Sequence, residues 1–217
     1  MIESFSTQDV LTEAAVGAIV DGLTSALVAR DQAHLVVTGG RSPGPIYDRL
    51  SGAVIDWSKV GVILSDDRCV SSTSPDSNER LVRARLLVDR AAQARFIPLG
   101  SELDDHLVRS MLPFDVTLLG MGEDGHVASL ITAWPEVAQA MDPADNRCLV
   151  AVPEGYGTPP LARISLRLSP LLTSRLTLIL IAGQAKRDLI ETRAGLPVHA
   201  LLKQAKGRVR VLWTPES

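Results

Sequence analysis

The chain has 217 residues, of which 46% are hydrophobic and only 4% aromatic, a composition that suits one large domain with a sizeable core. Its net charge of −3 provides no general basic field, which argues against nucleic acid and anionic membranes as partners. Cys69 and Cys148 lie far apart and form no CxxC unit, so a zinc ribbon or dithiol redox motif is unsupported and reduced thiols are expected.

The spacing of apolar residues predicts alternating helices and strands in the first half of the chain. A helix is expected over residues 7–30, with Ser6 as its N-cap. HLVVTGG then predicts a buried strand ending in glycines, and PIYDRL predicts the start of a second helix. VGVILSDD predicts a buried strand that ends in acids, and an amphipathic helix follows over residues 78–87.

The second half continues this alternation. Strands are expected at FDVTLLG, CLVAV, RISLRL, LTLILIAG and VRVLW, and helices from 184 to about 193 and over 197–204. Continuous apolar strands separated by helices indicate one α/β domain over residues 1–217, with a largely parallel, doubly wound, Rossmann-like sheet and helices on both faces. RISLRL alternates in polarity, so it suits an antiparallel or edge position in a smaller element.

Two further observations bear on where the protein is found. The N-terminal residues include early acids and no basic-then-apolar segment, so no secretory signal is expected. The longest uninterrupted apolar run, LTLILIAG, is far too short to span a bilayer. We therefore expect a soluble, cytoplasmic protein and, because no exposed apolar helix is obvious, a monomer.

Glycine-rich or charged sequences follow four of the predicted strands: TGGRSPG, SDDRC, GMGEDGH and IAGQAK. In open α/β sheets, ligands bind beyond the carboxyl ends of the strands. We therefore expect these four segments to converge on one ligand site.

Two of these segments match motifs whose mechanics they do not satisfy. Residues 120–125 fit G-x-G-x-x-G, but Glu123 and Asp124 would place carboxylates beside a pyrophosphate, and the downstream acid that holds a ribose is missing. Residues 40–44 fit the G-x-S-x-G nucleophile elbow, but the residue after the serine is Pro43, which has no N–H for an oxyanion hole. Neither nucleotide binding nor serine hydrolysis is favoured.

The loop after the first long strand suits an anion such as phosphate. Gly39 and Gly40 let the backbone approach a ligand closely, and a helix beginning near Pro43 would add free N–H groups and the positive end of its dipole. Ser42 can donate a hydroxyl and Arg41 can add a charge. A plain glycine turn is the alternative interpretation.

Three more cationic residues lie at or near predicted strand ends. Lys186 could supply charge to the same anion, or be a solvated lysine. Arg68, beside Asp66 and Asp67, could bind a ligand or form a structural ion pair. Arg163 could bind a ligand or pair with an acid.

His126 differs from His34, His106 and His199, which occupy ordinary structural or solvated contexts. Glycines let His126 lie at a strand end, with Asp124 two residues before it. A carboxylate beside an imidazole fixes its tautomer and raises its basicity. No second histidine or cysteine stands at metal-ligand spacing, so we expect a general base and no metal site.

Taken together, these segments resemble the glucosamine-6-phosphate isomerase/6-phosphogluconolactonase family and, within it, the 6-phosphogluconolactonases. The matching stretches cover nearly the whole chain in order: VVTGGRSP (36–43), LSDDRCVSSTSPDSN (64–78), LLGMGEDGHVASL (118–130), RISL (163–166) and IAGQAK (181–186), with weaker matches at PVHALL and VLW. GMGEDGHVASL and DDRCVSSTSPDSN are the specific ones.

The resemblance implies hydrolysis of 6-phospho-D-glucono-1,5-lactone to 6-phosphogluconate, the second step of the oxidative pentose phosphate pathway, without a metal or cofactor. It implies that His126 is the base that activates water and that Asp124 orients it. Arg68 and Lys186 would hold the phosphate or the developing charge, and residues 39–42 would bind phosphate.

The resemblance also carries departures. Asp66 would help to position Arg68 or the sugar hydroxyls, but DDR stands here in place of the commoner DER. Arg41 replaces a common serine, Ser71 a usual proline, and ITAWPE a more typical phenylalanine–proline pair. These differences leave the role of Arg41 open and do not alter the reaction class.

Two rival functions remain. Glucosamine-6-phosphate deaminase shares the fold, but its motifs continue into Ala-Phe-Asn-Glu-Pro and Asp-Glu-Tyr types of sequence, whereas this chain has HVASLITA and DDRC. A non-catalytic sugar-phosphate-binding domain is the other rival, and the intact Asp124 and His126 argue against it. A turnover assay separates the three.

Overall fold

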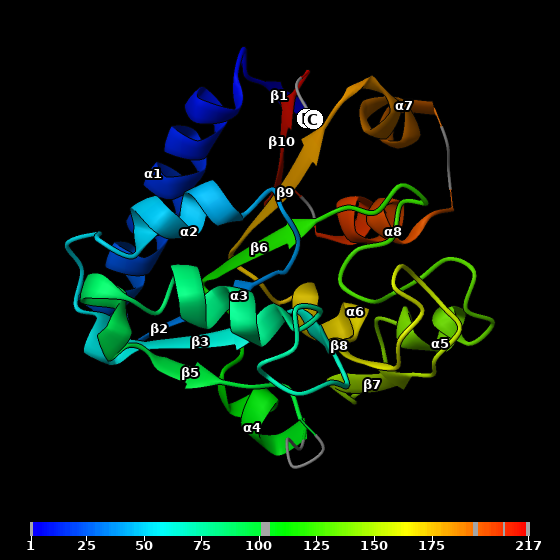
Figure 1. Cartoon of the computed structure of the whole chain (residues 1–217), viewed down its shortest axis with the longest axis horizontal. Helices are drawn as coiled ribbons and strands as arrows, with labels where there is room; N and C mark the ends of the chain where they lie inside the picture. Colours follow the sequence, from blue (N-terminus) through cyan, green and yellow to red (C-terminus); the bar gives the residue numbers. More distant parts are fainter. Residues whose placement is uncertain (1, 101–104, 193–194, 206, 216–217) are drawn as a thin grey trace.

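A seven-stranded, entirely parallel sheet runs through the protein, in the order β1-β10-β9-β6-β2-β3-β5 (Figure 1). The computed structural model describes residues 2–100, 105–192, 195–205 and 207–215. The strands of this sheet are β1 (Ile2–Ser4), β2 (Ala33–Val37), β3 (Val60–Leu64), β5 (Arg95–Ile97), β6 (Val116–Gly120), β9 (Leu176–Ala182) and β10 (Val209–Thr214). A smaller antiparallel sheet has the order β4 (Asp66–Arg68), β8 (Arg163–Leu166), β7 (Leu149–Val152).

Helices cover both faces of the large sheet because its strands are apolar on both sides. Along β9, Leu178 and Leu180 belong to one buried cluster, and Ile179 and Ile181 belong to the other. The first cluster includes residues from α1 (Gln8–Arg30), α2 (Gly44–Leu50) and α3 (Asn78–Arg85). The second includes residues from α4 (Asp105–Ser110), α5 (Val137–Ala140), α6 (Leu168–Leu171) and α8 (Pro197–Gln204), and α7 (Gln184–Thr192) packs against it. The predicted doubly wound α/β fold is confirmed.

Helix α1 is the longest element, and it differs from expectation in two ways. Its N-cap is Thr7 rather than Ser6, because the Thr7 hydroxyl accepts a hydrogen bond from the Val10 N–H (3.3 Å). By length and mean hydropathy (1.4) it could also cross a membrane, which a search for uninterrupted apolar runs overlooks. One face, however, is buried against the sheet through Leu11, Ala15, Ile19, Leu23 and Ala26, as in a helix that covers a globular core.

Three predicted strand regions contribute to the small sheet. VGVILSDD divides at Ser65: β3 ends at Leu64, and the chain then enters β4. CLVAV forms β7 in the same sheet, and the alternating RISLRL forms β8. The prediction that RISLRL is antiparallel is confirmed, but β8 lies between β4 and β7 rather than at an edge.

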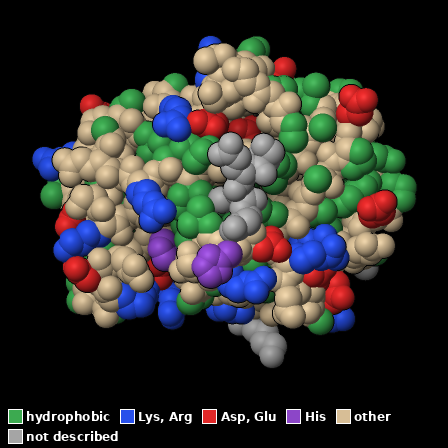
Figure 2. All heavy atoms as spheres, turned by 90° about the horizontal axis from the view of Figure 1, so that it is seen from below, with side chains coloured by type: hydrophobic (Ala, Val, Ile, Leu, Met, Phe, Trp, Pro, Cys, Tyr) green, Lys and Arg blue, Asp and Glu red, His purple; other side chains and the backbone are tan. Residues whose placement is uncertain are grey.

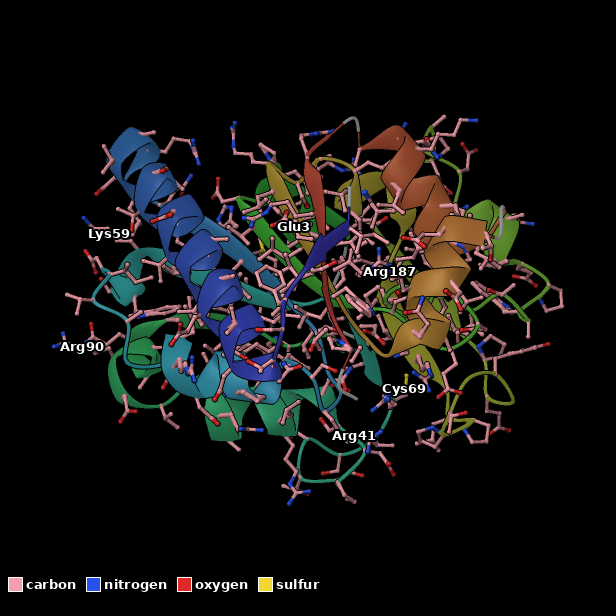
Figure 3. All side chains as sticks on the ribbon, turned by 90° about the horizontal axis from the view of Figure 1, so that it is seen from above. Glu3, Arg41, Lys59, Cys69, Arg90 and Arg187 are labelled. Atoms are coloured by element: carbon pink, nitrogen blue, oxygen red, sulfur yellow. The ribbon has the colours of Figure 1, made fainter. Side chains whose placement is uncertain are left out.

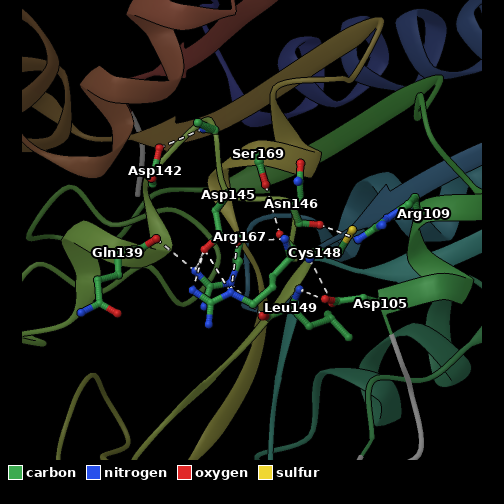
Figure 4. A network of polar contacts seen from close by, with 12 residues as sticks. Asp105, Arg109, Gln139, Asp142, Asp145, Asn146, Cys148, Leu149, Arg167 and Ser169 are labelled. Atoms are coloured by element: carbon green, nitrogen blue, oxygen red, sulfur yellow. Dashed lines mark hydrogen bonds and ion pairs between the residues drawn. The ribbon is translucent and has the colours of Figure 1, made fainter.

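A buried polar network attaches the segment between α5 and β7 to the small sheet (Figure 4). The Arg167 side chain is 6% exposed and donates hydrogen bonds to the Leu149 carbonyl (2.9 Å), the Gln139 carbonyl (3.0 Å) and Asp145 Oδ2 (2.9 Å). Asp105 of α4 accepts from the N–H groups of Cys148 (3.0 Å) and Leu149 (2.9 Å). These bonds satisfy backbone groups that no strand pairing reaches.

The strand order reverses between β2 and β6. From β2 the chain proceeds outward through β3 to β5, whereas from β6 it proceeds the opposite way through β9 to β10. The connections that follow β2 and β6 therefore diverge to opposite faces, which opens a crevice at the carboxyl ends of these strands. The glycine-rich loops after both strands lie at this point.

Candidate active site

A cavity of about 240 Å³ lies at this crevice, and it contains almost all of the residues that the sequence singled out. Nine of the ten predicted site residues line it: Gly39, Gly40, Arg41, Ser42, Asp66, Arg68, His126, Arg163 and Lys186. The tenth, Asp124, is bonded to His126. The four polar strand ends thus converge on one site. In Figure 3, Arg41 and Cys69 mark two of these loops on the same side of the molecule, away from Lys59 and Arg90.

His126 and Asp124 form a close pair at the cavity wall. His126 Nδ1 lies 2.5 Å from Asp124 Oδ1, and the His126 N–H donates to the same oxygen (3.3 Å). Burial raises the pKa of Asp124, but the hydrogen bond and charge of His126 outweigh this and bring it to about 2. The carboxylate is therefore ionised at neutral pH and can accept a hydrogen bond from Nδ1, which leaves Nε2 without a hydrogen-bond partner among the described residues.

Two of the glycines around His126 are explained by local packing and backbone conformation rather than by a nucleotide. A Cβ at Gly122 would lie 2.2 Å from His126 Cε1 and 2.8 Å from Asp124 Oδ1. Gly125 has a positive φ of 80°, and a Cβ there would lie 2.6 Å from Leu196 Cδ1. The loop that imitates a dinucleotide motif is thus shaped to hold a histidine against a carboxylate.

The loop after β2 presents free backbone donors to the cavity. Within the described part of the chain, the N–H groups of Gly40, Arg41 and Ser42 have no hydrogen-bond partner. Gly40 adopts a positive φ of 92°, which a side chain would disfavour. α2 begins at Gly44, directly after Pro43, as the sequence indicated. A tight loop with several free N–H groups forms an anion-binding concavity.

The Arg68 guanidinium makes hydrogen bonds through Nη1, and its Nε has no hydrogen-bond partner. Its Nη1 donates to the Asp76 carbonyl (2.7 Å) and to Asn78 Oδ1 (3.2 Å). Its Nε is buried and has no hydrogen-bond partner. A buried donor without an acceptor is rare in folded proteins, so this nitrogen is a candidate donor to a ligand.

Arg163, at the start of β8, lies deeper in the site. It is only 3% exposed, donates from Nη2 to the Pro159 carbonyl (2.8 Å), and its Nε is also buried without a partner. Burial, and then the charge of Arg68, lowers the pKa of Arg163. Arg163 Nη1 lies 4.0 Å from Asp66 Oδ2, so the nearest carboxylate balances it weakly. Two neighbouring guanidinium groups with unused donors favour an anionic ligand.

Asp66 and Asp67 point to opposite sides of β4. Asp66 lines the cavity and accepts hydrogen bonds from the hydroxyls of Ser65 (2.9 Å) and Ser129 (2.6 Å). The carboxylate of Asp66 is therefore linked to Ser129 and Arg163. Asp67 turns toward the start of α3, and burial raises its pKa even though it accepts several hydrogen bonds from that helix and its flank.

Lys186, in the first turn of α7, reaches back to the loop after β6. Its Nζ donates to the Met121 carbonyl (2.7 Å) and lines the cavity. The pKa of Lys186 is lowered, mainly by burial. The nearby Glu123 acts in the opposite direction, and the charge of Arg41 lowers the pKa further. Lys186 and Arg41 therefore act as two positive charges near the same anion site.

Sequence reasoning assigned no role to Asn78, Ser129 or Thr158, although Asn78 and Thr158 line the cavity and Ser129 binds Asp66. Asn78 and Ser129 lie inside the stretches that carry the family resemblance, which was the one signal available for them.

Among the described residues, no group of three or more His, Cys, Asp or Glu side chains is placed to hold a metal ion. His199 bonds the Leu196 N–H (3.3 Å) and the Ile190 carbonyl (3.1 Å), a structural arrangement.

Comparisons with known proteins agree with this arrangement. The family model described as glucosamine-6-phosphate isomerases/6-phosphogluconolactonase matches residues 6–213. A 6-phosphogluconolactonase of Caulobacter vibrioides is 40% identical over 223 residues, which cover 98% of this chain and 96% of that protein. The crystal structure of a 6-phosphogluconolactonase from Shewanella baltica superposes with a TM-score of 0.88 at 33% identity, covering 99% of this chain and 97% of that one.

A monomeric glucosamine-6-phosphate deaminase also superposes, with a TM-score of 0.79 at 19% identity, over 99% of this chain and 97% of that one. That likeness concerns the fold alone, so the fold does not separate the two activities. The family model and the relatives of higher identity cover nearly every element described above. The chain belongs to the glucosamine-6-phosphate isomerase/6-phosphogluconolactonase family.

Proposed function

We propose that this protein hydrolyses 6-phospho-D-glucono-1,5-lactone to 6-phosphogluconate, the second step of the oxidative pentose phosphate pathway. The names of its relatives support this reaction, and so does the chemistry of the cavity. The single observation that carries the proposal is the His126–Asp124 pair (2.5 Å) at the wall of a cavity lined by Arg68, Arg163 and Lys186. A base and a set of cations in one small cavity suit hydrolysis of a phosphorylated lactone.

His126 acts as the general base in this proposal. Its Nδ1 proton is held by Asp124, so Nε2 takes a proton from a water molecule while the water oxygen attacks the lactone carbonyl carbon. The tetrahedral intermediate then collapses and breaks the bond to the ring oxygen, which receives the proton back from Nε2. The product acid releases a proton to solvent, so one water is consumed and one carboxylate is formed.

The cationic groups bind the phosphate and the developing negative charge. The free N–H groups of residues 40–42 and the charge of Lys186 suit a phosphate, which accepts several hydrogen bonds at once. The unused donors of Arg68 and Arg163 lie in the same cavity. Stabilisation of an oxyanion by fixed donors is a large term in acyl-transfer catalysis.

Turnover assays test the proposal directly. Freshly prepared 6-phosphogluconolactone is followed by acid release against its spontaneous hydrolysis, with glucosamine 6-phosphate as the counter-substrate. We expect hydrolysis of the lactone and no ammonia from the amino sugar. His126→Ala should lower kcat by a factor of about 100 or more while the protein remains folded. Near-normal turnover in that variant would remove His126 from the role of base.

Substrate-binding variants separate the two classes of role. Lys186→Ala should chiefly raise KM for the phosphorylated lactone, because a point charge on the phosphate contributes to binding in ground and transition states alike. An unchanged KM would refute the phosphate assignment of Lys186. Turnover of the amino sugar in preference to the lactone would favour the deaminase alternative.

A further inference from the structure

Asn78, the first residue of α3, connects three parts of the site. Its side chain is almost fully buried (3% exposed), and its Nδ2 donates to the Asp66 carbonyl (2.8 Å). A carbonyl only accepts hydrogen bonds, so this contact fixes the orientation of the amide and directs Oδ1 to Arg68 Nη1 (3.2 Å). The Asn78 N–H donates to Asp67 Oδ1 (2.7 Å), so the backbone of this residue is fixed as well.

The contact with Asn78 determines which edge of the Arg68 guanidinium is available. The group is planar with donors in a rigid fork, so holding Nη1 leaves Nε and Nη2 together on the opposite edge. Nη1 is bound twice, by Asn78 Oδ1 and by the Asp76 carbonyl (2.7 Å). Nε is buried without a partner, and Nη2 makes no hydrogen bond among the described residues. This free edge matches two oxygens of one anionic group.

Asn78 also contacts the glycine loop. A Cβ at Gly39 would lie 1.8 Å from Asn78 Oδ1, so the loop packs directly on the amide. Because the same side chain touches the loop and holds Arg68, it fixes the spacing between the Arg68 edge and the free N–H groups of residues 40–42. One side chain thus aligns two sets of anion donors.

We propose that Asn78 is a positioning residue that holds Arg68 for bidentate binding of an anionic group with two oxygens. The chemistry fits the phosphate of a sugar phosphate or the carboxylate of a sugar acid. This inference deepens the proposed function and rests on it for the identity of the ligand.

A double-mutant cycle tests the proposal by titration calorimetry. The ligands are 6-phosphogluconate, inorganic phosphate and D-gluconate, and the proteins are wild type, Asn78→Leu, Arg68→Ala and the double variant. We expect Asn78→Leu to weaken binding of 6-phosphogluconate about tenfold, and to have less than about a twofold effect once Arg68 is absent. Weaker binding of inorganic phosphate identifies the phosphate as the group held, and weaker binding of D-gluconate identifies the carboxylate.

Ser77→Ala is the matched control. Ser77 caps the same helix by accepting from the Arg80 N–H (3.2 Å), and it makes no contact with Arg68 among the described residues. It should lower thermal stability and leave binding of 6-phosphogluconate within about twofold of wild type. If Asn78→Leu does not fold, Asn78→Ala replaces it, because alanine removes the amide and adds no bulk beside Gly39.

Two outcomes would overturn the proposal: wild-type affinity in the folded Asn78 variant, or an equal loss of affinity with and without Arg68. An equal loss would mean that Asn78 acts on the fold in general. The cycle measures binding and needs no turnover, so it remains informative if the wild type fails to hydrolyse the lactone.

Discussion

Individual residues around His126 are constrained by space as much as by chemistry. Gly122 faces the imidazole and the carboxylate at once, because a Cβ would lie 2.2 Å from one and 2.8 Å from the other. Gly120, two residues earlier, has nothing within 4 Å of the corresponding position. The two glycines look equivalent in the sequence motif, yet only one of them touches the pair.

Gly122→Ala should therefore reduce catalysis without a change in any acid–base group. The added methyl must displace His126 from Asp124, and we expect kcat for lactone hydrolysis to fall by a factor of about 100, in the range for loss of a general base. Gly120→Ala is the control, because its methyl enters open space and should leave the pair intact. Equal kcat values in the two variants would contradict this explanation.

The pKa of Asp124 leads to a prediction about acid stability. Burial raises it, but His126 lowers it to about 2 in the folded chain, below the ordinary 3.8. A carboxyl with a lowered pKa stabilises the fold above its unfolded pKa, and this contribution is lost as the pH falls through the folded value. Between about pH 5 and about pH 2, wild type should lose more free energy of unfolding than Asp124→Asn does. Urea unfolding at both ends of that range measures the difference, and parallel losses would refute it.

The sequence identified most of the candidate site because the chemistry lay at strand ends. Arg68, His126 and Lys186 each lie within about six residues of the end of a strand of the parallel sheet, so their convergence follows from that sheet. Asn78 and Ser129 lie about ten or more residues from the strand ends they serve, and their roles depend on tertiary contacts with Asp66 and Arg68. Local patterns carry no information about such contacts.

At the scale of elements, the length of a helix or strand decides whether the spacing of its apolar residues can predict it. The long strands β9 and β10 and the helices α1 and α7 were predicted close to their observed ends. The three-residue edge strands β1 and β5 and the short helices α5 and α6 were missed, because a few residues do not establish a period. Tertiary pairing, rather than local preference, produces these short elements.

The network around Arg167 shows how an irregular segment is stabilised, and it can be tested. Arg167 binds three acceptors while buried, whereas Arg147 binds the same Asp145 from an exposed position (59%). Arg167 donates from both Nε and Nη1, and lysine has a single nitrogen that cannot occupy both positions. Arg167→Lys should lower the free energy of unfolding by about 2 kcal/mol, and Arg147→Lys should change it far less, because Arg147 is exposed to solvent. Urea unfolding gives both values, and similar values would contradict the assigned role of the network.

At the scale of the whole molecule, fold class was predictable and sheet membership was not. Apolar strands alternating with helices implied a doubly wound parallel sheet, which the structure confirms. The sequence does not show that the chain leaves this sheet at Ser65, because β3 and β4 form one continuous pattern. The separation appears only when β8 and β7 pair with β4.

That the protein is a monomer, as the sequence suggested, remains a prediction. Among the described residues, the large apolar side chains that are exposed are Val10 (46%), Val28 (84%) and Val54 (82%). On the face shown in Figure 2, acidic and basic side chains are intermixed, with no large field of one sign. We expect light scattering to give the mass of one chain at all concentrations tested. A mass that rises with concentration would contradict this.

The register of β4 determines more than the pairing of three residues. Asp66 pairs with Ser165 and Arg68 with Arg163, while Asp67, between them, points to the other side. A shift of one residue would turn Asp67 into the cavity and Asp66 toward α3, exchanging two identical side chains while removing Arg68 from the site. Gain or loss of a single residue between Ser65 and Arg68 would therefore invert the alternation of side chains along the strand and abolish the site. Insertions in the exposed turn after Arg68 would leave this alternation intact, so homologous chains should tolerate a change of length in that turn and not between Ser65 and Arg68.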